Sequence, residues 1–136
     1  MDLLLINSDF NLKKLLTYHL EKKGFSIESR DSLLDSLEII NSKSFKVIVI
    51  DLIDQNNLDE KNLNILKLKN PDVIIIITVE FGKVDLAIKA CKMGADDYLT
   101  KPVGAEQIQF TIEKIQKIKK LKNENKYLKQ KLNNSN

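Results

Sequence analysis

Several residue types are scarce in this sequence of 136 residues, and each scarcity removes a class of chemistry. The single cysteine, Cys91, cannot form an internal disulfide and suits a reducing compartment. His19 is the only histidine, so zinc binding and Ser-His-Asp catalysis have little support. The longest apolar run, Val73–Ile77, is far too short to span a bilayer. No signal peptide is visible, and we therefore expect a cytoplasmic protein without membrane contact.

The remaining composition is that of an ordinary soluble domain, with 43% hydrophobic and 30% charged residues. The net charge is unevenly spread along the chain. Residues 105–136 hold eight Lys and three Glu, which gives +5. The rest of the chain holds fourteen Lys plus Arg and sixteen Asp plus Glu, which gives −2. A basic tail can indicate nucleic-acid binding. Lysine on the exposed face of a helix is the commoner cause, and we expect no direct nucleic-acid binding by this chain.

The most informative stretch is Lys46–Asp51, which reads KVIVID. Four consecutive apolar residues predict a strand that is buried on both faces of a parallel sheet. The strand ends on Asp51, and ligands of open α/β sheets bind outside the carboxyl ends of the strands. Asp51 is therefore a candidate for chemistry, with the alternative that it only starts a turn or caps a helix.

The rest of the chain alternates between short apolar runs and helical spacings. Four further strands are predicted at Leu3–Ile6, Phe25–Glu28 (towards an edge), Val73–Thr78 and Asp97–Thr100. Helices are predicted at 10–23, capped by Asp9, after Asp31 or Ser32, at Leu58–Leu68, after Gly82, and from Ala105 onwards. Their expected inward residues are Leu12, Leu15, Leu16 and Leu20; Leu33, Leu34, Leu37 and Ile40; Leu63 and Leu66; Val84, Ala87, Ala90 and Cys91; Ile108, Ile112 and Ile115.

This alternation predicts an α/β protein with a doubly wound parallel sheet, a flavodoxin-like (βα)5 fold of strand order 2-1-3-4-5 with an extended C-terminal helix. The carboxyl ends of the strands would gather Asn7, Ser8 and Asp9 with Asp51, Thr78 or Val79, and Lys101.

The arrangement resembles the receiver domain of two-component response regulators over residues 1–117. Its most specific stretch is KMGADDYLTKP at Lys92–Pro102, supported by VIVID ending at Asp51 and by PDVIIIIT at Pro71–Thr78. The resemblance implies a signalling module and not an enzyme. It also implies that a sensor histidine kinase transfers a phosphoryl group to Asp51.

The same resemblance implies roles for other residues. An acidic pair after the first strand helps to bind Mg²⁺ in this family, together with the phosphoacceptor. A hydroxyl residue ends the fourth strand, the aromatic that matches Tyr98 moves on activation, and the lysine that matches Lys101 contacts the phosphoryl group. The bond between that lysine and the following proline, here Pro102, is often cis.

The sequence departs from the family pattern at the metal ligands. Asn7 and Ser8 stand at the acidic pair. Asp9 is the next residue, and it is either a further ligand or no more than the cap of the first helix. The resemblance therefore implies a weak Mg²⁺ site formed by Asp51, Asp9, Asn7 and Ser8. Asp54 and Gln55 replace the usual Met-Pro. Val79 falls in the hydroxyl position unless the loop Glu80–Lys83 holds one extra residue, in which case Thr78 does.

Three functions remain open at this point. The first is a phosphoaccepting receiver, and the second is a pseudo-receiver that dimerises without phosphate. The third is an aspartate-nucleophile hydrolase, although such enzymes carry a second carboxylate two residues on, where this chain has Ile53.

The tail, residues 118–136, predicts a coiled-coil linker. Ile118, Leu121, Asn125, Leu128 and Leu132 alternate at spacings of three and four, which is an a-d-a-d-a seam. We expect a homodimer through this last helix. The layout is similar to the N-terminal part of NtrC-type transcription activators, in which an output domain follows; no output domain is visible in this sequence, and control of transcription is the implied output.

Overall fold

The structure is a computed structural model, and it describes residues 1–53 and 60–134. In this part of the chain, one parallel sheet has the order β2-β1-β3-β4-β5. Its strands are β1 (Asp2–Ile6), β2 (Ser26–Arg30), β3 (Val47–Asp51), β4 (Ile74–Val79) and β5 (Asp97–Thr100). The expected flavodoxin-like topology is confirmed, with β2 at one edge and β3 in the centre.

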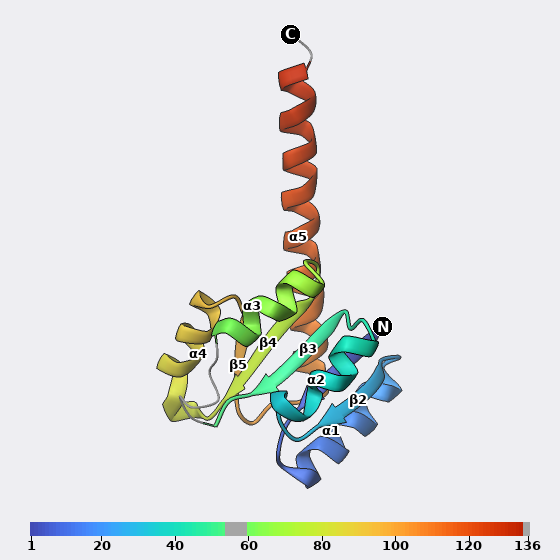
Figure 1. The fold of residues 1–136 in the computed structure, drawn as a ribbon, viewed down its shortest axis with the longest axis vertical. Helices are drawn as coiled ribbons and strands as arrows, with labels where there is room; N and C mark the ends of the chain where they lie inside the picture. The colour runs from blue at the N-terminus through green and yellow to red at the C-terminus, as the bar shows by residue number, and fades with distance from the viewer. Residues whose placement is uncertain (54–59, 135–136) are drawn as a thin grey trace.

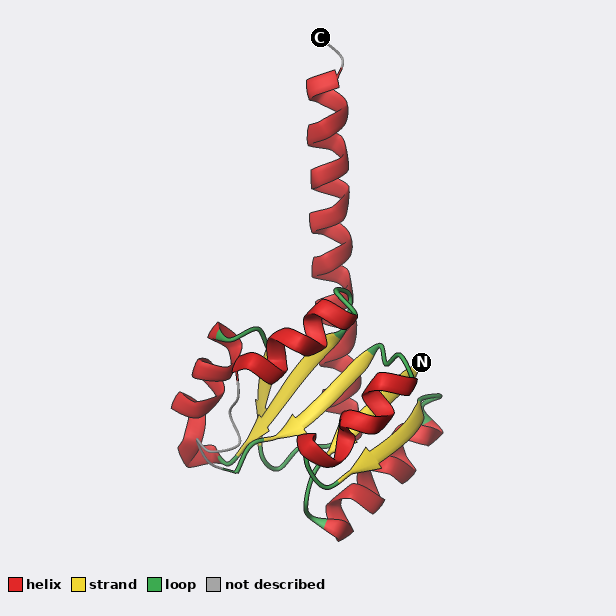
Figure 2. Cartoon of the chain, viewed as in Figure 1, coloured by secondary structure: helices red, strands yellow, loops and turns green. Residues whose placement is uncertain are grey.

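Helices cover both faces of the sheet (Figure 1, Figure 2). The helical segments are α1 (Phe10–Lys22), α2 (Leu33–Ser42), α3 (Glu60–Lys69), the short 3₁₀ turn η2 (Phe81–Lys83), α4 (Val84–Lys92) and α5 (Ala105–Asn134). Helices α1 and α5 lie on one face, and α2, α3 and α4 lie on the other (Figure 1). The first residues of the helix expected at Leu58–Leu68 fall outside the described part of the chain.

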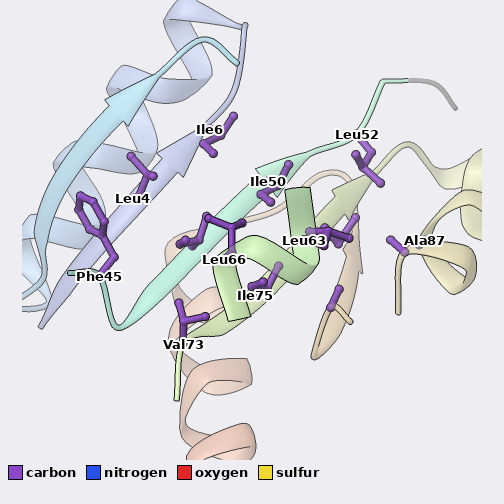
Figure 3. Close-up of a cluster of buried hydrophobic side chains, with 14 of the residues drawn as sticks. Leu4, Ile6, Phe45, Ile50, Leu52, Leu63, Leu66, Val73, Ile75 and Ala87 are labelled. Atoms are coloured by element: carbon purple, nitrogen blue, oxygen red, sulfur yellow. The ribbon is translucent and has the colours of Figure 1, made fainter. Parts of the chain in front are cut away.

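Alternation along the central strands divides the core into two layers. Leu4 and Ile6 belong to the layer that α2, α3 and α4 cover, whereas Leu3 and Leu5 belong to the layer that α1 and α5 cover. Figure 3 shows the first layer, in which Leu63 and Leu66 of α3 lie over Ile50 and Ile75. Because successive strand side chains point to opposite faces, a sheet covered on both sides needs continuous apolar runs. The runs VIVI and IIII therefore specify the layered fold.

Two expected helix faces were partly wrong. Leu34 is 76% exposed and Leu37 is 39% exposed, while Ser36 of the same helix is fully buried. The Ser36 hydroxyl donates to the Ser32 carbonyl at 2.6 Å, which satisfies it inside the helix. On α1, Leu16 and Leu20 are buried, but Leu15 is 55% exposed. Both helices carry more leucines than one buried stripe can hold, so spacing alone could not select the inward set.

Side-chain caps fix the starts of α1 and α2. The Asp9 carboxylate accepts a hydrogen bond from the backbone N–H of Leu12 at 3.1 Å, as the sequence predicts. At α2 the cap is Ser32, whose hydroxyl accepts from the Asp35 N–H at 3.1 Å. Each cap satisfies a backbone donor that the helix leaves unpaired.

Helix α5 has two parts. Ile108, Ile112 and Ile115 are buried against the sheet, as expected. Beyond them the helix leaves the body and projects from the side opposite the carboxyl ends of the strands (Figure 1). Its tail exposes the expected seam: Ile118 by 45%, Leu121 by 50%, Leu128 by 54% and Leu132 by 70%.

Candidate functional site

The site begins with Asp51, the last residue of the central strand β3. Its neighbour in the sheet is Thr78 of β4, because the two strands pair in parallel register. The Leu52 N–H continues this pairing by donating to the Thr78 carbonyl at 2.9 Å. Residues 54–59, which include Asp54 and Gln55 after the strand, lie outside the described part.

Two side chains converge on the Asp51 carboxylate. The Thr78 hydroxyl donates to Oδ1 at 2.7 Å. The Lys101 Nζ lies 2.8 Å from Oδ1 and 3.0 Å from Oδ2. Asp51 and Lys101 are fifty residues apart, and the fold brings them together because both follow strands that end at the same edge.

The electrostatics of this cluster are those of a nearly buried ion pair. The Asp51 side chain is 5% exposed, and that of Lys101 is 28% exposed. A carboxylate removed from water is costly unless a cation and hydrogen-bond donors compensate it. Lys101 supplies the cation, and Thr78 supplies a neutral donor. The cluster is therefore electrically balanced without any added group.

The loops around the cluster explain which residue fills the hydroxyl position. Thr78, and not Val79, lies against Asp51; Val79 is fully buried in the core. The turn η2 after Val79 takes up the extra length of the loop. The Lys101 N–H donates to the Val79 carbonyl at 2.8 Å, which fixes the chain where it leaves β5. The bond between Lys101 and Pro102 is cis, as the resemblance implied.

Tyr98 lies in β5 beside this cluster. It is partly buried and packs against the core layer that contains α3 and α4. Its strand neighbour is Ile77, one residue before Thr78. Nearby on α4, burial raises the pKa of the Cys91 thiol, and the carboxylates of Asp97 and Asp96 raise that pKa further.

The three residues that follow β1 are arranged differently from one another. Asn7 is buried, with 4% exposed, and its side-chain oxygen accepts from the Asp9 N–H at 2.8 Å. Ser8 is exposed. Asp9 is exposed too, and its carboxylate caps α1. Two of the expected metal ligands therefore already have partners within their own turn.

These residues fit a Mg²⁺ ion poorly. Mg²⁺ requires oxygen ligands in octahedral geometry and is usually held by one or two carboxylates. Here the only buried carboxylate of the set, Asp51, is paired with Lys101, and Asn7 is neutral. Among residues 1–53 and 60–134, no group of three or more His, Cys, Asp or Glu side chains could hold a metal ion. The donor set thus supports, at most, weak metal binding.

The structure also adds Lys83, which the sequence did not single out. Its Nζ donates to the Ile53 carbonyl at 2.6 Å, two residues beyond Asp51. Lys83 ends η2 and directly precedes α4, so the loop after β4 carries a second cation to the edge that holds Lys101. The extra loop residue was the only sequence signal. A loop's length, however, does not say where its lysine reaches.

Sequence comparisons identify the family of this chain. The response regulator receiver domain model matches residues 3–113. A putative NtrX-like response regulator of Rickettsia typhi is 28% identical over 134 residues, covering 97% of this chain and 28% of the relative. The photosynthetic apparatus regulatory protein RegA of Cereibacter sphaeroides is 32% identical over 112 residues, covering 81% of this chain and 60% of the relative. The chain thus spans less than two thirds of these relatives' lengths.

Structural comparisons give the same fold. NtrX from Brucella abortus superposes with a TM-score of 0.76 at 23% identity, over 90% of this chain and 29% of that one. A Burkholderia pseudomallei response regulator, solved with a phosphorylated aspartic acid, a calcium ion and citrate, gives 0.71 at 25% identity, over 90% and 74% of the two chains. With its aspartate, hydroxyl and lysine meeting at the end of the central strand, the chain belongs to the response regulator receiver domain family of two-component signalling.

Proposed function

We propose that Asp51 accepts a phosphoryl group from the histidine of a sensor kinase. Receiver domains of response regulators are phosphorylated by such kinases. The observation that carries the proposal is the convergence of Thr78 and Lys101 on Asp51. The phosphorylated aspartic acid of the Burkholderia relative supports it by analogy.

The chain's own residues account for the chemistry that transfer requires. Phosphoryl transfer depends mainly on positioning and on neutralising charge. An Asp51 oxygen attacks the phosphorus as the P–N bond to the kinase histidine breaks, and the imidazole leaves with the electron pair. Lys101 moves from the carboxylate towards the phosphoryl oxygens. The Thr78 hydroxyl, released from Oδ1, donates to one of those oxygens. Tyr98 then responds to the movement of Thr78, because Tyr98 pairs in the sheet with Ile77, the residue before Thr78.

The C-terminal tail is the basis for the proposed output of this signalling domain. We propose that residues 1–117 form the receiver and residues 118–136 a coiled-coil linker, and that phosphorylation controls a homodimer formed through α5. Transcription is the proposed output, by analogy with the transcriptional regulatory protein ZraR of Klebsiella oxytoca. The chain would act in the cytoplasm as a signalling module without enzymatic activity or direct nucleic-acid contact. No helix in the described residues combines the length and hydrophobicity of a membrane span.

Intact-mass analysis after incubation with acetyl phosphate and Mg²⁺ tests the acceptor. We expect the wild-type chain to gain the mass of one phosphoryl group and Asp51→Asn to gain none. Labelling of both proteins would place the modification elsewhere. The absence of labelling from the wild type, with acetyl phosphate and with a kinase, would refute the proposal.

A second candidate function is a pseudo-receiver that signals without phosphate. The observation that favours it is that both oxygens of Asp51 already have partners. Such a closed site would hold one conformation permanently, and the dimer would form equally well in Asp51→Asn. Sedimentation of that variant, before and after acetyl phosphate, distinguishes the two functions.

A further inference from the structure

A second lysine approaches the phosphoacceptor edge. Lys83 is half-buried, and its ammonium donates to the Ile53 carbonyl at 2.6 Å. The turn η2 holds its backbone, since the Lys83 N–H donates to the Glu80 carbonyl at 2.9 Å. Lys83 therefore comes from the carboxyl end of β4, the strand that also carries Thr78, and it contacts the segment that leaves β3 just after Asp51.

The charges at this edge are the reverse of those that a metal site needs. Asp51 contributes one negative charge, and Lys101 and Lys83 contribute two positive charges. Asn7 and Ser8 are neutral, and Asp9 is exposed and caps α1. A divalent cation approaching Asp51 would be repelled by both ammonium groups. A phosphoryl dianion would instead meet two ammonium groups, since Asp51, Lys101 and Lys83 together carry a net charge of +1.

We propose that Lys83 takes the place of the divalent cation, so that Asp51 accepts a phosphoryl group without metal. This inference rests on the proposed function of Asp51 as the acceptor. Lysine and Mg²⁺ can serve the same purpose, because both clamp the oxygens of a transferring phosphoryl group. An ammonium has three donors, so Lys83 can keep the Ile53 carbonyl and still donate to a phosphoryl oxygen. Lys101 and Thr78 bind the remaining oxygens.

With acetyl phosphate as donor, the transfer balances without a metal or a proton. A lone pair on an Asp51 oxygen forms the new O–P bond. The bond between phosphorus and the acetate oxygen breaks, and acetate leaves with the electron pair. The reactants are a carboxylate and the acetyl phosphate dianion, and the products are an aspartyl phosphate dianion and acetate. The two lysines stay protonated throughout and offset the charge on the phosphoryl oxygens.

The test compares rates of acetyl phosphate labelling in EDTA and in Mg²⁺ by intact mass. We expect the wild-type labelling rates in the two conditions to agree within about twofold. Lys83→Met should lower the labelling rate in EDTA by about tenfold or more, which corresponds to a loss of ~1.4 kcal/mol of transition-state stabilisation. Lys83→Arg should retain most of that rate. Lys92→Met, an exposed lysine at the far end of α4, is the matched control and should label like the wild type.

A second readout does not depend on labelling. Because the ammonium and the cation compete for one edge, calorimetry should show tighter Mg²⁺ binding to Lys83→Met than to the wild type or Lys92→Met. Circular dichroism and thermal unfolding would establish that the variants fold.

The outcomes separate this inference from the proposed function. Two results would refute the role proposed for Lys83 and leave Asp51 as the acceptor. One is labelling of the wild type that is lost in EDTA, and the other is an equal labelling rate in EDTA for Lys83→Met and the wild type. No labelling in either condition overturns both.

Discussion

At the scale of single residues, the pairing of Asp51 with Lys101 has a measurable energetic consequence. We expect Lys101→Met to lower the free energy of unfolding by about 1–3 kcal/mol, because it leaves a nearly buried carboxylate without its cation. Asp51→Asn should cost less, since Lys101 is partly exposed and can turn to water. In the double variant, the additional cost of Lys101→Met should largely disappear. Urea unfolding of all four proteins measures this coupling.

The control for that cycle is Lys92→Met in the same two backgrounds. Lys92 is exposed, and it is the last residue of α4. Its effect should be small and the same with Asp51 or Asn at position 51. Additive costs for Asp51→Asn and Lys101→Met would mean that the ion pair contributes nothing to folding.

The same residues show what the sequence could predict at the site. Parallel strands that end at one edge bring Asp51 and Lys101 together with Thr78 or Val79, whatever their separation along the chain. Topology therefore predicted the cluster but left the choice between Thr78 and Val79 open, and the structure places Thr78 against Asp51. The sequence did not indicate Lys83 as a site residue, because its position depends on the turn η2 and on the rotamers of a long side chain. Neither quantity follows from hydrophobic periodicity.

At the scale of secondary structure, the first turn of α1 decides between two roles of Asp9. If Asp9 is a helix cap, Asp9→Ala should lower the free energy of unfolding by about 1 kcal/mol, and Asp9→Asn should be nearly neutral, because Asn caps as well as Asp. Neither change should weaken Mg²⁺ binding measurably. Urea unfolding and calorimetry provide the two measurements, with Ser32→Ala at α2 as a capping control of similar cost.

A large loss of Mg²⁺ affinity in Asp9→Asn, without loss of stability, would identify Asp9 as a metal ligand instead. The double variant Asn7→Asp with Ser8→Asp provides the opposite reference, since it restores two carboxylates after β1 and should strengthen Mg²⁺ binding.

Elements were predicted unequally well, for a physical reason. The strands lie between two helical layers, so their apolar runs leave little choice of position, and β4 differs from its prediction by one residue at each end. Helix α2 has apolar residues around much of its circumference, and its inward face is chosen by contact with the sheet. That contact turns Ser36 inward and Leu34 outward, which periodicity could not reveal.

At the scale of the whole molecule, the edge of the sheet that holds Asp51 and the tail lie at opposite ends of the body. Asp51 ends β3, and the exposed part of α5 projects from the side where the strands begin (Figure 1). Two ion pairs connect the base of that part with the body. Lys119 Nζ lies 3.7 Å from the Asp96 carboxylate, and Lys114 Nζ lies 2.8 Å from the Asp97 carboxylate. Both aspartates flank the start of β5, the strand that leads to Lys101. One strand and one helix thus connect the site with the base of the tail.

The exposed seam on α5 predicts a dimer in solution. Ile118, Leu121, Leu128 and Leu132 present an apolar stripe, and Asn125 at a core position favours a parallel two-stranded register. We expect the full chain to sediment as a dimer, and Leu121→Ser with Leu128→Ser to shift it towards monomer. Asn123→Ser with Gln130→Ser, on the outer side of the same helix, should leave the dimer intact. If the seam variant dimerises as well as the wild type, the contact must lie on the receiver body; a wild type that stays monomeric at high concentration would exclude both interfaces.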